Sequence, residues 1–514
     1  MNLMKLADSN VERYGQYTQI YFGDKEYSNT DIIRNAKRLA SGLKNLGIKK
    51  GDKIVVMLPN CPEVFVSYQA ILRNGAVIIP MMFLLGPSEM KHILMNSEAV
   101  AVITTKDFLE KVEPARANIK TLKHIIVLGD DDVPGTTNFN RLIIENAEQP
   151  IDVDIEEDDL ALILYTAGTT GIPKGVMLTH GNLCACAINA FSIDDKSHSD
   201  TTLFVLPLSH VFGITQMNIG YLAGNKMVLL SRFDLEETFK SIEKYKVTDF
   251  SGVPAMFALM LNSSLSEEYD LSSLKTVSGG SAPLPVEVLF GFQKKFNIGA
   301  IREGYGLSET GSIVSVLRPG RPQKPGSVGE LIPSLEIRLV DSDGNEVPKG
   351  EIGEITLRGP SVFKGYYKMP EETAQALKDG WLYTGDMGRL DEDNYLYIVE
   401  RKKDLVIRGG FNIYPRDVEE VLYRHPAVLE CAVVGVPDAV MGEEVKAYVV
   451  LKEGKTATEE DLIKHTQEYL AKYKTPRYIE FVASLPKNPM GKVLRKELRA
   501  MAAASQAEAA ATKE

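Results

Sequence analysis

The sequence predicts an α/β protein. We expect a large multi-sheet N-terminal domain that includes a small barrel-like module, followed by a small α+β C-terminal domain. Strand-type apolar runs alternate with helix-length segments, the pattern changes to short alternating strands after Gly326, and a charged run at residues 400–404 precedes a distinct C-terminal part. Because 514 residues exceed what one hydrophobic core usually organises, more than one domain is expected.

The large domain is predicted from short apolar runs that are bounded by turn residues. A helix is expected at residues 62–73, between the first two runs. The runs are residues 53–59, 76–81, 99–105, 124–129, 160–165, 203–206, 226–230, 249–252 and 274–278. Such alternation is typical of layered sheets covered by helices.

The barrel-like module is expected between residues 326 and 358, where the sequence DSDG at residues 341–344 predicts a turn between antiparallel strands. The charged run then suggests a boundary, with domains at 1–402 and 403–514. The smaller domain is predicted to contain helices at 415–425 and 458–471 and strands at 432–436 and 446–451. The alanine-rich tail, residues 502–514, lacks an apolar face and is expected to be a frayed helix or disordered.

Composition limits the classes of function. Hydrophobic residues at 44% and charged residues at 25% are those of an ordinary globular protein. The net charge of -11 disfavours nonspecific binding to nucleic acid or to an anionic membrane. If the substrate is an anion, its binding site must therefore contain Lys or Arg side chains or a metal ion that offset the negative charge of the protein.

The four cysteines are few and irregularly spaced, which predicts a reducing compartment and a cytoplasmic protein. Cys184 and Cys186 form a C-x-C pair, but no further Cys/His cluster accompanies it. The N-terminus has no signal-like apolar segment, and the longest apolar run, residues 76–85, is too short to span a bilayer.

A glycine-rich loop, YTAGTTGIPKG at residues 165–175, is the strongest indication of chemistry. Its backbone N–H groups can converge on phosphate oxygens, while Thr166, Thr169 and Thr170 add hydroxyls and Lys174 adds a positive charge. Pro173 before the lysine excludes a Walker loop, and the loop is not a GxGxxG fingerprint either. The alternative is a flexible surface turn.

Three further residues fit a nucleotide site, each with a structural alternative. Glu309, after the glycine turn in GYGLSET, is suited to bind Mg²⁺. Asp386 in YTGD is suited to accept ribose hydroxyls, although an ordinary Asx turn has the same sequence. Arg401 offers a fork of donors for ribose or phosphate, but an arginine in a charged run is often a solvated residue between domains.

A second lysine loop, PKNPMGKVLR at residues 486–495, presents Lys492 at a tip made of Pro and Gly. An ammonium there can bridge a carboxylate oxygen and an α-phosphate oxygen while negative charge accumulates. The alternative is a basic surface loop.

Taken in order, the motifs resemble those of the adenylate-forming superfamily, which includes acyl-CoA synthetases, luciferases and the adenylation domains of peptide synthetases. The amino-acid sequences of these motifs are most similar to those of bacterial fatty acyl-CoA ligases. The motifs, at residues 165–175, 207–213, 278–284, 304–309, 383–386, 400–415 and 486–492, extend over most of the chain. The resemblance implies an AMP-forming ligase that uses ATP, Mg²⁺ and coenzyme A.

The resemblance also implies roles for single residues. The phosphates would be held by Thr166, Gly168, Thr169, Thr170 and Lys174, and the metal by Glu309. Adenine would lie against Gly280, Ser281, Ala282, Gly304, Tyr305 and Gly306, and the ribose against Asp386 and Arg401. Lys492 would be the catalytic lysine, with Thr170, His210 and Glu309 beside the reacting groups, and Lys403 would be the hinge of a mobile C-terminal domain. Gly409 and Gly410 would pass close to pantetheine, and the acyl pocket would be lined by Val211, Phe212, Gly213, Val253, Met256 and Ile313.

Packing under the loop is the structural alternative for His210. Ala167 stands where the family usually has Ser, so altered phosphate binding is expected, and the apolar Ile407 favours the fatty acyl branch.

The apolar pocket segments favour a medium- to long-chain fatty acid as substrate, with aromatic or alicyclic acids as alternatives. An adenylating enzyme that loads a carrier protein and a nonenzymatic nucleotide-binding protein are rival classes. Nucleic acid and integral membrane segments are not expected. Peripheral membrane contact stays open, as does the choice between monomer and homodimer.

Overall fold

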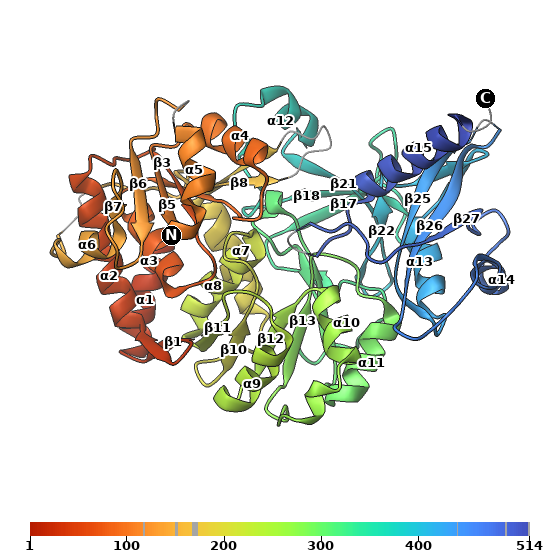
Figure 1. Cartoon of the computed structure of the whole chain (residues 1–514), viewed down its shortest axis with the longest axis horizontal. Coiled ribbons are helices and arrows are strands. Elements are labelled where there is room, and N and C mark those ends of the chain that lie inside the picture. The colour runs from red at the N-terminus through yellow and green to blue at the C-terminus, as the bar shows by residue number, and fades with distance from the viewer. Residues whose placement is uncertain (117–118, 150–152, 167–172, 439, 489–490, 512–514) are drawn as a thin grey trace.

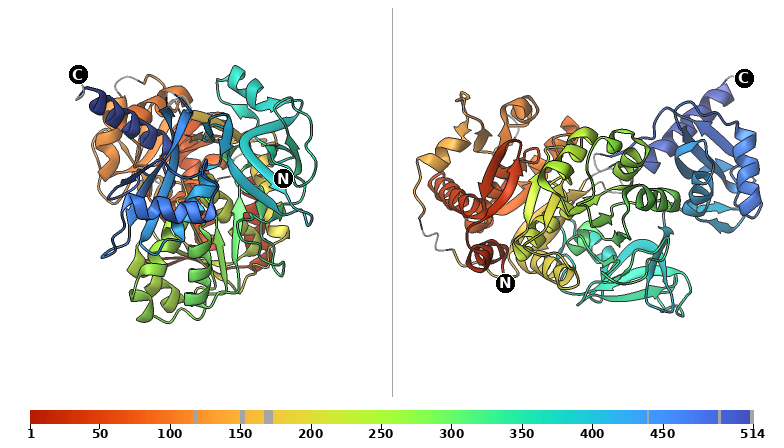
Figure 2. Two further views of the ribbon diagram at one scale, coloured as in Figure 1. Left: turned by 90° about the vertical axis from the view of Figure 1, so that its right-hand side faces the viewer. Right: turned by 90° about the horizontal axis from the view of Figure 1, so that it is seen from below.

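A computed structural model describes residues 1–116, 119–149, 153–166, 173–438, 440–488 and 491–511 of the chain. Two large sheets with their helices form the N-terminal part, an antiparallel sheet follows, and a separate sheet with its own helices forms the C-terminal unit (Figure 1). This arrangement confirms the predicted α/β class. The C-terminal unit lies at one end of the elongated molecule (Figure 2).

The first large sheet has eight strands in the order β19-β9-β8-β4-β3-β5-β6-β7. Its strands are β3 (Lys53–Met57), β4 (Val77–Pro80), β5 (Ala101–Thr105), β6 (His124–Leu128), β7 (Thr137–Asn138), β8 (Leu160–Thr166), β9 (Lys174–Thr179) and β19 (Gly365–Tyr366). The helices of this region are α2 (Asn29–Asn45), α3 (Pro62–Arg73), α4 (Pro87–Ser97), α5 (Leu109–Arg116) and α6 (Phe139–Ile144), with a short 3-10 helix at Lys106–Phe108. The helix expected at residues 62–73 is confirmed, with Pro62 at its first position, where a missing N–H costs nothing.

The second large sheet has nine strands in the order β16-β15-β14-β13-β12-β10-β11-β1-β2. Its strands are β1 (Thr18–Phe22), β2 (Lys25–Ser28), β10 (Thr201–Phe204), β11 (Lys226–Leu229), β12 (Asp249–Gly252), β13 (Thr276–Gly279), β14 (Ile301–Tyr305), β15 (Ser315–Val316) and β16 (Glu330–Leu331). Its helices are α1 (Leu3–Tyr14), α7 (His180–Ser192), α8 (Val211–Ala223), α9 (Leu235–Tyr245), α10 (Pro254–Asn262) and α11 (Val286–Phe296), with 3-10 turns at Leu265–Glu267 and Ser308–Thr310. The largest hydrophobic core joins α2, α3, α7 and α8 to residues of both large sheets.

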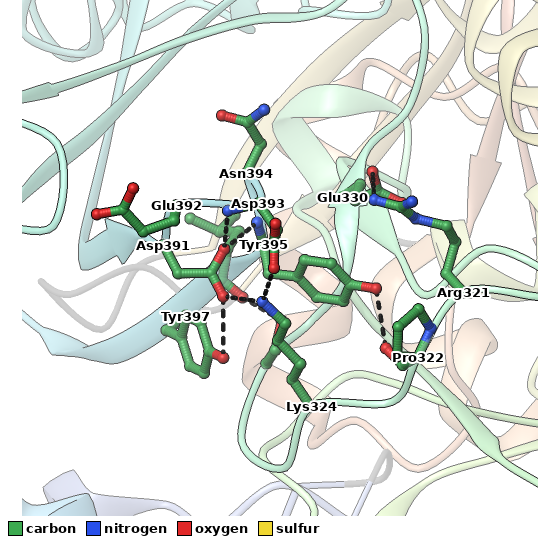
Figure 3. A network of polar contacts seen from close by, with 12 residues as sticks. Arg321, Pro322, Lys324, Glu330, Asp391, Glu392, Asp393, Asn394, Tyr395 and Tyr397 are labelled. Carbon is green, nitrogen blue, oxygen red and sulfur yellow. Dashed lines mark hydrogen bonds and ion pairs between the residues drawn. The ribbon is translucent and has the colours of Figure 1, made fainter.

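The barrel-like module is a five-stranded antiparallel sheet, as the turn sequence predicted. Its strands are β17 (Glu336–Val340), β18 (Gly353–Arg358), β20 (Leu377–Lys378), β21 (Trp381–Leu390) and β22 (Leu396–Arg401), and α12 (Pro370–Ala376) precedes β20. The turn between β21 and β22 is fixed by polar contacts (Figure 3). Lys324 lies 2.6 Å from carboxylate oxygens of both Asp391 and Asp393, and the Tyr395 hydroxyl donates to the carbonyl of Pro322 at 2.8 Å. This network ties β22 to the segment that leads into β16.

The C-terminal unit has its own five-stranded sheet and two hydrophobic clusters. Its elements are β23 (Val406–Arg408), β24 (Phe411–Ile413), α13 (Pro415–Tyr423), β25 (Val428–Asp438), β26 (Gly442–Leu451), α14 (Glu459–Tyr469), β27 (Tyr478–Phe481) and α15 (Arg495–Ala511). The tail is helical as far as Ala511, and one part of the expectation was wrong: Ala502 is buried, because α15 packs Leu498 and Ala502 against β25 and β26. Among the helices in the described residues, none combines the length and the apolar character that crossing a membrane requires.

Candidate active site

The glycine-rich loop joins two antiparallel strands, since β8 pairs with β9 in a hairpin. Thr166 is the last residue of β8 and faces Lys174, the first residue of β9. Gly168, Thr169 and Thr170 lie outside the described residues, as does Ala167. The hairpin therefore brings the two described ends of the loop together at the carboxyl end of β8.

Tyr366 links the loop lysine to the candidate metal ligand. Its hydroxyl donates a 2.8 Å hydrogen bond to Oε1 of Glu309, and the Nζ of Lys174 lies 5.1 Å from the centre of its ring. Burial and the carboxylate of Glu309 raise the pKa of Tyr366 far above its usual range, so the hydroxyl stays protonated and donates. Sequence analysis missed this residue, because only the pairing of β19 with β9 brings it here.

Glu309 is suited to hold Mg²⁺. Its main-chain carbonyl accepts a 2.8 Å hydrogen bond from the N–H of Phe363, and its carboxylate is held by Tyr366. Magnesium is usually bound through one or two carboxylates together with substrate phosphates. The part of the chain that the structure describes contains no group of three or more His, Cys, Asp or Glu that could hold a metal, so phosphates and water would supply the other ligands. The hard oxygen donor therefore fits the ion.

The segments predicted to bind adenine follow adjacent parallel strands. Gly280, Ser281 and Ala282 follow β13, and Gly304 and Tyr305 end β14 just before Gly306. Ser281 has a φ of 70°, a left-handed conformation that non-glycine residues seldom adopt. A Cβ on Gly306 would lie 1.4 Å from the carbonyl oxygen of Ser312, so only glycine fits this turn.

Asp386 and Arg401 face each other across β21 and β22. The Nε of Arg401 lies 3.0 Å from Oδ1 of Asp386, and the hydroxyl of Tyr305 donates to Oδ2 at 2.6 Å. Only 3% of Asp386 is exposed, so its carboxylate is held rigidly and its charge is paired. The predicted adenine residue Tyr305 and the two predicted ribose residues thus form one cluster.

Lys492 reaches this cluster from the C-terminal unit. The N–H of Lys492 donates to Oδ1 of Asn488. Gly491 abuts Val253 and Ala255, whose side chains would lie 3.7 Å from a Cβ built on this glycine. The side chain of Lys492 is open to solvent, and partial desolvation by the surrounding protein, followed by the charge of Arg401, lowers its pKa to about 8. Lys492 therefore lies within electrostatic range of the predicted ribose residues Asp386 and Arg401.

His210 lies within electrostatic range of Lys492. Burial, with a smaller effect of the lysine charge, lowers the pKa of His210 to about 4, so the imidazole is neutral at pH 7. Its Nδ1 accepts a 3.2 Å hydrogen bond from the N–H of Phe212 at the start of α8. The ring thus caps the start of α8, and its place beside the reacting groups stays a prediction.

The predicted acyl-pocket residues surround this histidine unevenly. Val211 and Val253 are only 2% and 4% exposed, and Val211 packs into the largest core cluster, whereas Phe212, Met256 and Ile313 are half-buried. A Cβ on Gly280 would lie 3.4 Å from the ring of Phe212, and one on Gly213 would lie 2.3 Å from the carbonyl of Pro207. The half-buried members are therefore the ones available to a ligand.

The remaining predicted residues belong to the region beyond β22. Lys403 lies exposed between β22 and β23. Gly409 and Gly410 form the turn between β23 and β24, with φ values of 58° and 85° that favour glycine. Gly409 abuts Met441 of the same unit, and none of the described residues comes within 4 Å of a Cβ built on Gly410. These two glycines are not part of the cluster around Lys492.

Comparison with known proteins covers nearly the whole chain. A family model described as AMP-binding enzyme matches residues 7–367, and one described as AMP-binding enzyme C-terminal domain matches residues 417–492. A long-chain-fatty-acid–CoA ligase of Bacillus subtilis (strain 168) is 39% identical, with 96% of this chain and 94% of that protein aligned. A feruloyl-CoA synthase of an Amycolatopsis species is 36% identical, with 94% and 95% aligned.

Among solved structures, an anthranilate CoA ligase, AuaEII, in complex with anthranoyl-AMP superimposes with a TM-score of 0.93 at 30% identity. The alignment covers 99% of this chain and 98% of that one. The similarity thus includes the large sheets, the antiparallel module and the C-terminal unit.

Proposed function

The chain belongs to the AMP-binding enzyme family and is an AMP-forming acyl-CoA synthetase, and from this we propose that it activates an apolar carboxylic acid, first of all a medium- to long-chain fatty acid. The two curated relatives named above are a CoA ligase and a CoA synthase aligned along nearly the full length, which supports this activity over the nonenzymatic and carrier-loading alternatives. ATP and CoA are substrates of this family.

The character of the pocket residues supports an apolar acid. Phe212, Met256 and Ile313 are apolar and half-buried, and the segments 211–214 and 253–256 contain no charged residue to pair with a polar substrate head. Because His210 is neutral, it does not pair with the carboxylate of the substrate, and Lys492 is the positively charged residue close to His210 that can. An amino acid or dicarboxylate would have to bury an unpaired charge there.

An aromatic acid is the second candidate. Similarity to a feruloyl-CoA synthase and to an anthranilate CoA ligase favours it, since an aryl group would also suit apolar walls. The two candidates differ in the length of pocket they require.

In the first step, a carboxylate oxygen of the acid attacks the α-phosphorus of ATP, and the bond to the leaving pyrophosphate breaks. Bound Mg²⁺ would neutralise phosphate charge. Lys492 would balance the charge that develops between the carboxylate and the α-phosphate, while Asp386 and Arg401 would fix the ribose. Tyr366 would hold the carboxylate of Glu309 in a fixed orientation.

We also propose that the glycine-rich loop binds the phosphates of ATP. Thr166 and Lys174 would contact the β- and γ-phosphates together with Gly168, Thr169 and Thr170. Adenine would lie against the turns after β13 and β14.

In the second step, the CoA thiol attacks the acyl carbonyl, its proton passes to solvent, and AMP leaves. We propose that the boundary between the two domains lies between residues 402 and 403, and that the C-terminal domain rotates about Lys403. This rotation would withdraw Lys492 and bring Gly409 and Gly410 close to the pantetheine arm that carries the CoA thiol. The change of sheet between β22 and β23 supports this division.

The observation that carries the proposal is that Gly491 abuts Val253 and Ala255, which places Lys492 within electrostatic range of Asp386, Arg401 and His210. Pyrophosphate release with MgATP and CoA, measured over aliphatic, aromatic and alicyclic acids, tests it. We expect the highest kcat/KM for aliphatic acids of medium or long chain. A preference for aryl acids would select the second candidate, and turnover only with polar acids would refute the apolar pocket.

A further inference from the structure

Two arginines of the C-terminal unit reach strand β22 of the N-terminal part. The Nη1 of Arg416, on α13, donates a 2.7 Å hydrogen bond to the carbonyl of Ile398. The guanidinium of Arg495, at the start of α15, lies 3.6 Å from the carboxylate of Glu400. Because Lys403 lies two residues after the end of β22, both contacts cross the proposed hinge.

A glutamate on α13 accompanies each arginine. Glu420 lies 3.8 Å from Arg416, and Glu419 lies 2.6 Å from Arg495. The exposed fractions of the four side chains range from 13% to 23%. Arg495 and Glu419 are hydrogen-bonded, whereas Arg416 and Glu420 form an ion pair. Charged pairs in such partly desolvated surroundings interact more strongly than fully exposed ion pairs.

Glu420 makes a second contact across the same interface. Its Oε2 accepts from the N–H of Val286, the first residue of α11, at 3.5 Å. The N-terminus of a helix carries unpaired N–H groups and a partial positive charge, which a carboxylate stabilises. Arg416 and Glu420 together therefore fasten α13 to β22 and α11 at once.

The interface that Arg416 and Glu420 form lies close to the candidate active site. Glu303, buried on β14 in the electrostatic range of Arg416 and Glu420, lies two residues before Tyr305, which binds Asp386. On the other side, the docked unit presents Gly491 to Val253 and Lys492 to the ribose cluster. A loss of docking at α13 would thus move Lys492 as well.

We propose that Arg416 and Glu420 are positioning residues that latch the C-terminal unit in the adenylating arrangement, and that the latch must open before the thioester step. The inference rests on the proposed function, because it assigns Lys492 to the first step alone. Arg495 is left out of the test, since its charge also acts on Lys492.

The test compares Arg416→Ala and Glu420→Gln with the wild type in the two half-reactions. ATP–pyrophosphate exchange reports adenylation, and thioester formation from supplied acyl-adenylate and CoA reports the second step. Loss of a charge-assisted bond predicts an exchange rate about tenfold lower, with thioester formation unchanged or faster. The control is Arg424→Ala, at the end of the same helix, where the guanidinium lies over Tyr469 within the C-terminal unit.

Limited proteolysis with trypsin tests the latch without any acid substrate. In the presence of ATP, trypsin should cleave after Lys402 and Lys403 faster in Arg416→Ala than in the wild type or Arg424→Ala, at equal thermal stability. Equal loss of both half-reactions, or unchanged exchange and unchanged cleavage, would overturn the latch. If the wild type released no pyrophosphate with any acid, the proposed function would fail, and the cleavage rates would still decide the latch.

Discussion

Tyr366 and Glu309 are joined by a 2.8 Å hydrogen bond in which the tyrosine hydroxyl donates to Oε1 of the carboxylate. The same ring lies under the ammonium of Lys174. One side chain thus connects the candidate metal ligand with the end of the phosphate loop, although its neighbours are far away in the sequence.

Replacing Tyr366 by Phe should weaken magnesium dependence without unfolding the protein. Loss of one hydrogen bond to a carboxylate is expected to raise the Mg²⁺ concentration for half-maximal pyrophosphate release by about fivefold to tenfold. The control is Tyr367→Phe, whose hydroxyl contacts the carboxylate of Glu98 at 3.3 Å instead. An unchanged magnesium requirement in Tyr366→Phe would contradict the role of this contact.

The pH dependence of adenylation should report Lys492. Its pKa is lowered to about 8, so the ammonium is present below pH 8 and lost above it. The kcat/KM for ATP, which reflects the free enzyme, is therefore expected to fall by about tenfold per pH unit above pH 8. Bound phosphates favour the charged lysine, so kcat should fall only at higher pH. A kcat/KM that stays level up to pH 10 would exclude a charge requirement at Lys492.

Glu303 should make the stability of the chain depend on pH. Burial raises its pKa to about 7, against the opposing effect of Arg416 and with a further increase from Glu420. Gln323, Lys324 and Tyr395 line the space beside it.

Because the folded chain holds a proton that the unfolded chain releases, this contribution is present below the ordinary carboxyl pKa and is lost as the pH rises to about 7. Glu303→Gln should abolish a change of roughly 1–3 kcal/mol between pH 4.5 and 7, measured as the free energy of unfolding. The exposed Glu287→Gln is the control. Parallel pH profiles for wild type and Glu303→Gln would show that Glu303 is not the group responsible.

The local elements could be predicted from the sequence because their signals are local. Pro62 and the apolar run after it define α3, and short apolar runs define β3, β6 and other strands of the parallel sheets. Strand β25 extends further than expected, from Val428 to Asp438, because pairing with β26 includes the polar Glu430 and continues to Asp438. Tertiary pairing there outweighs the local preference.

The site was predictable only where a motif marks it. Asp386, Arg401 and Lys492 follow glycine turns or charged runs, and the structure brings them together. Tyr366 could not be found, since its place depends on β19 pairing with a strand nearly two hundred positions earlier in the chain. Arg416 and Glu420 could not be found either, because charges on an amphipathic helix usually face solvent.

The most direct test of the account is the Lys492→Ala variant in the two half-reactions, with the exposed Lys496→Ala as control. We predict that pyrophosphate release from MgATP and a fatty acid falls by roughly a hundredfold or more, because the developing charge loses its counterion. Thioester formation from supplied acyl-adenylate and CoA should stay within about twofold of the wild type, since the proposed rotation withdraws Lys492 before that step. Equal loss of both activities would contradict the assignment of Lys492 to adenylation alone.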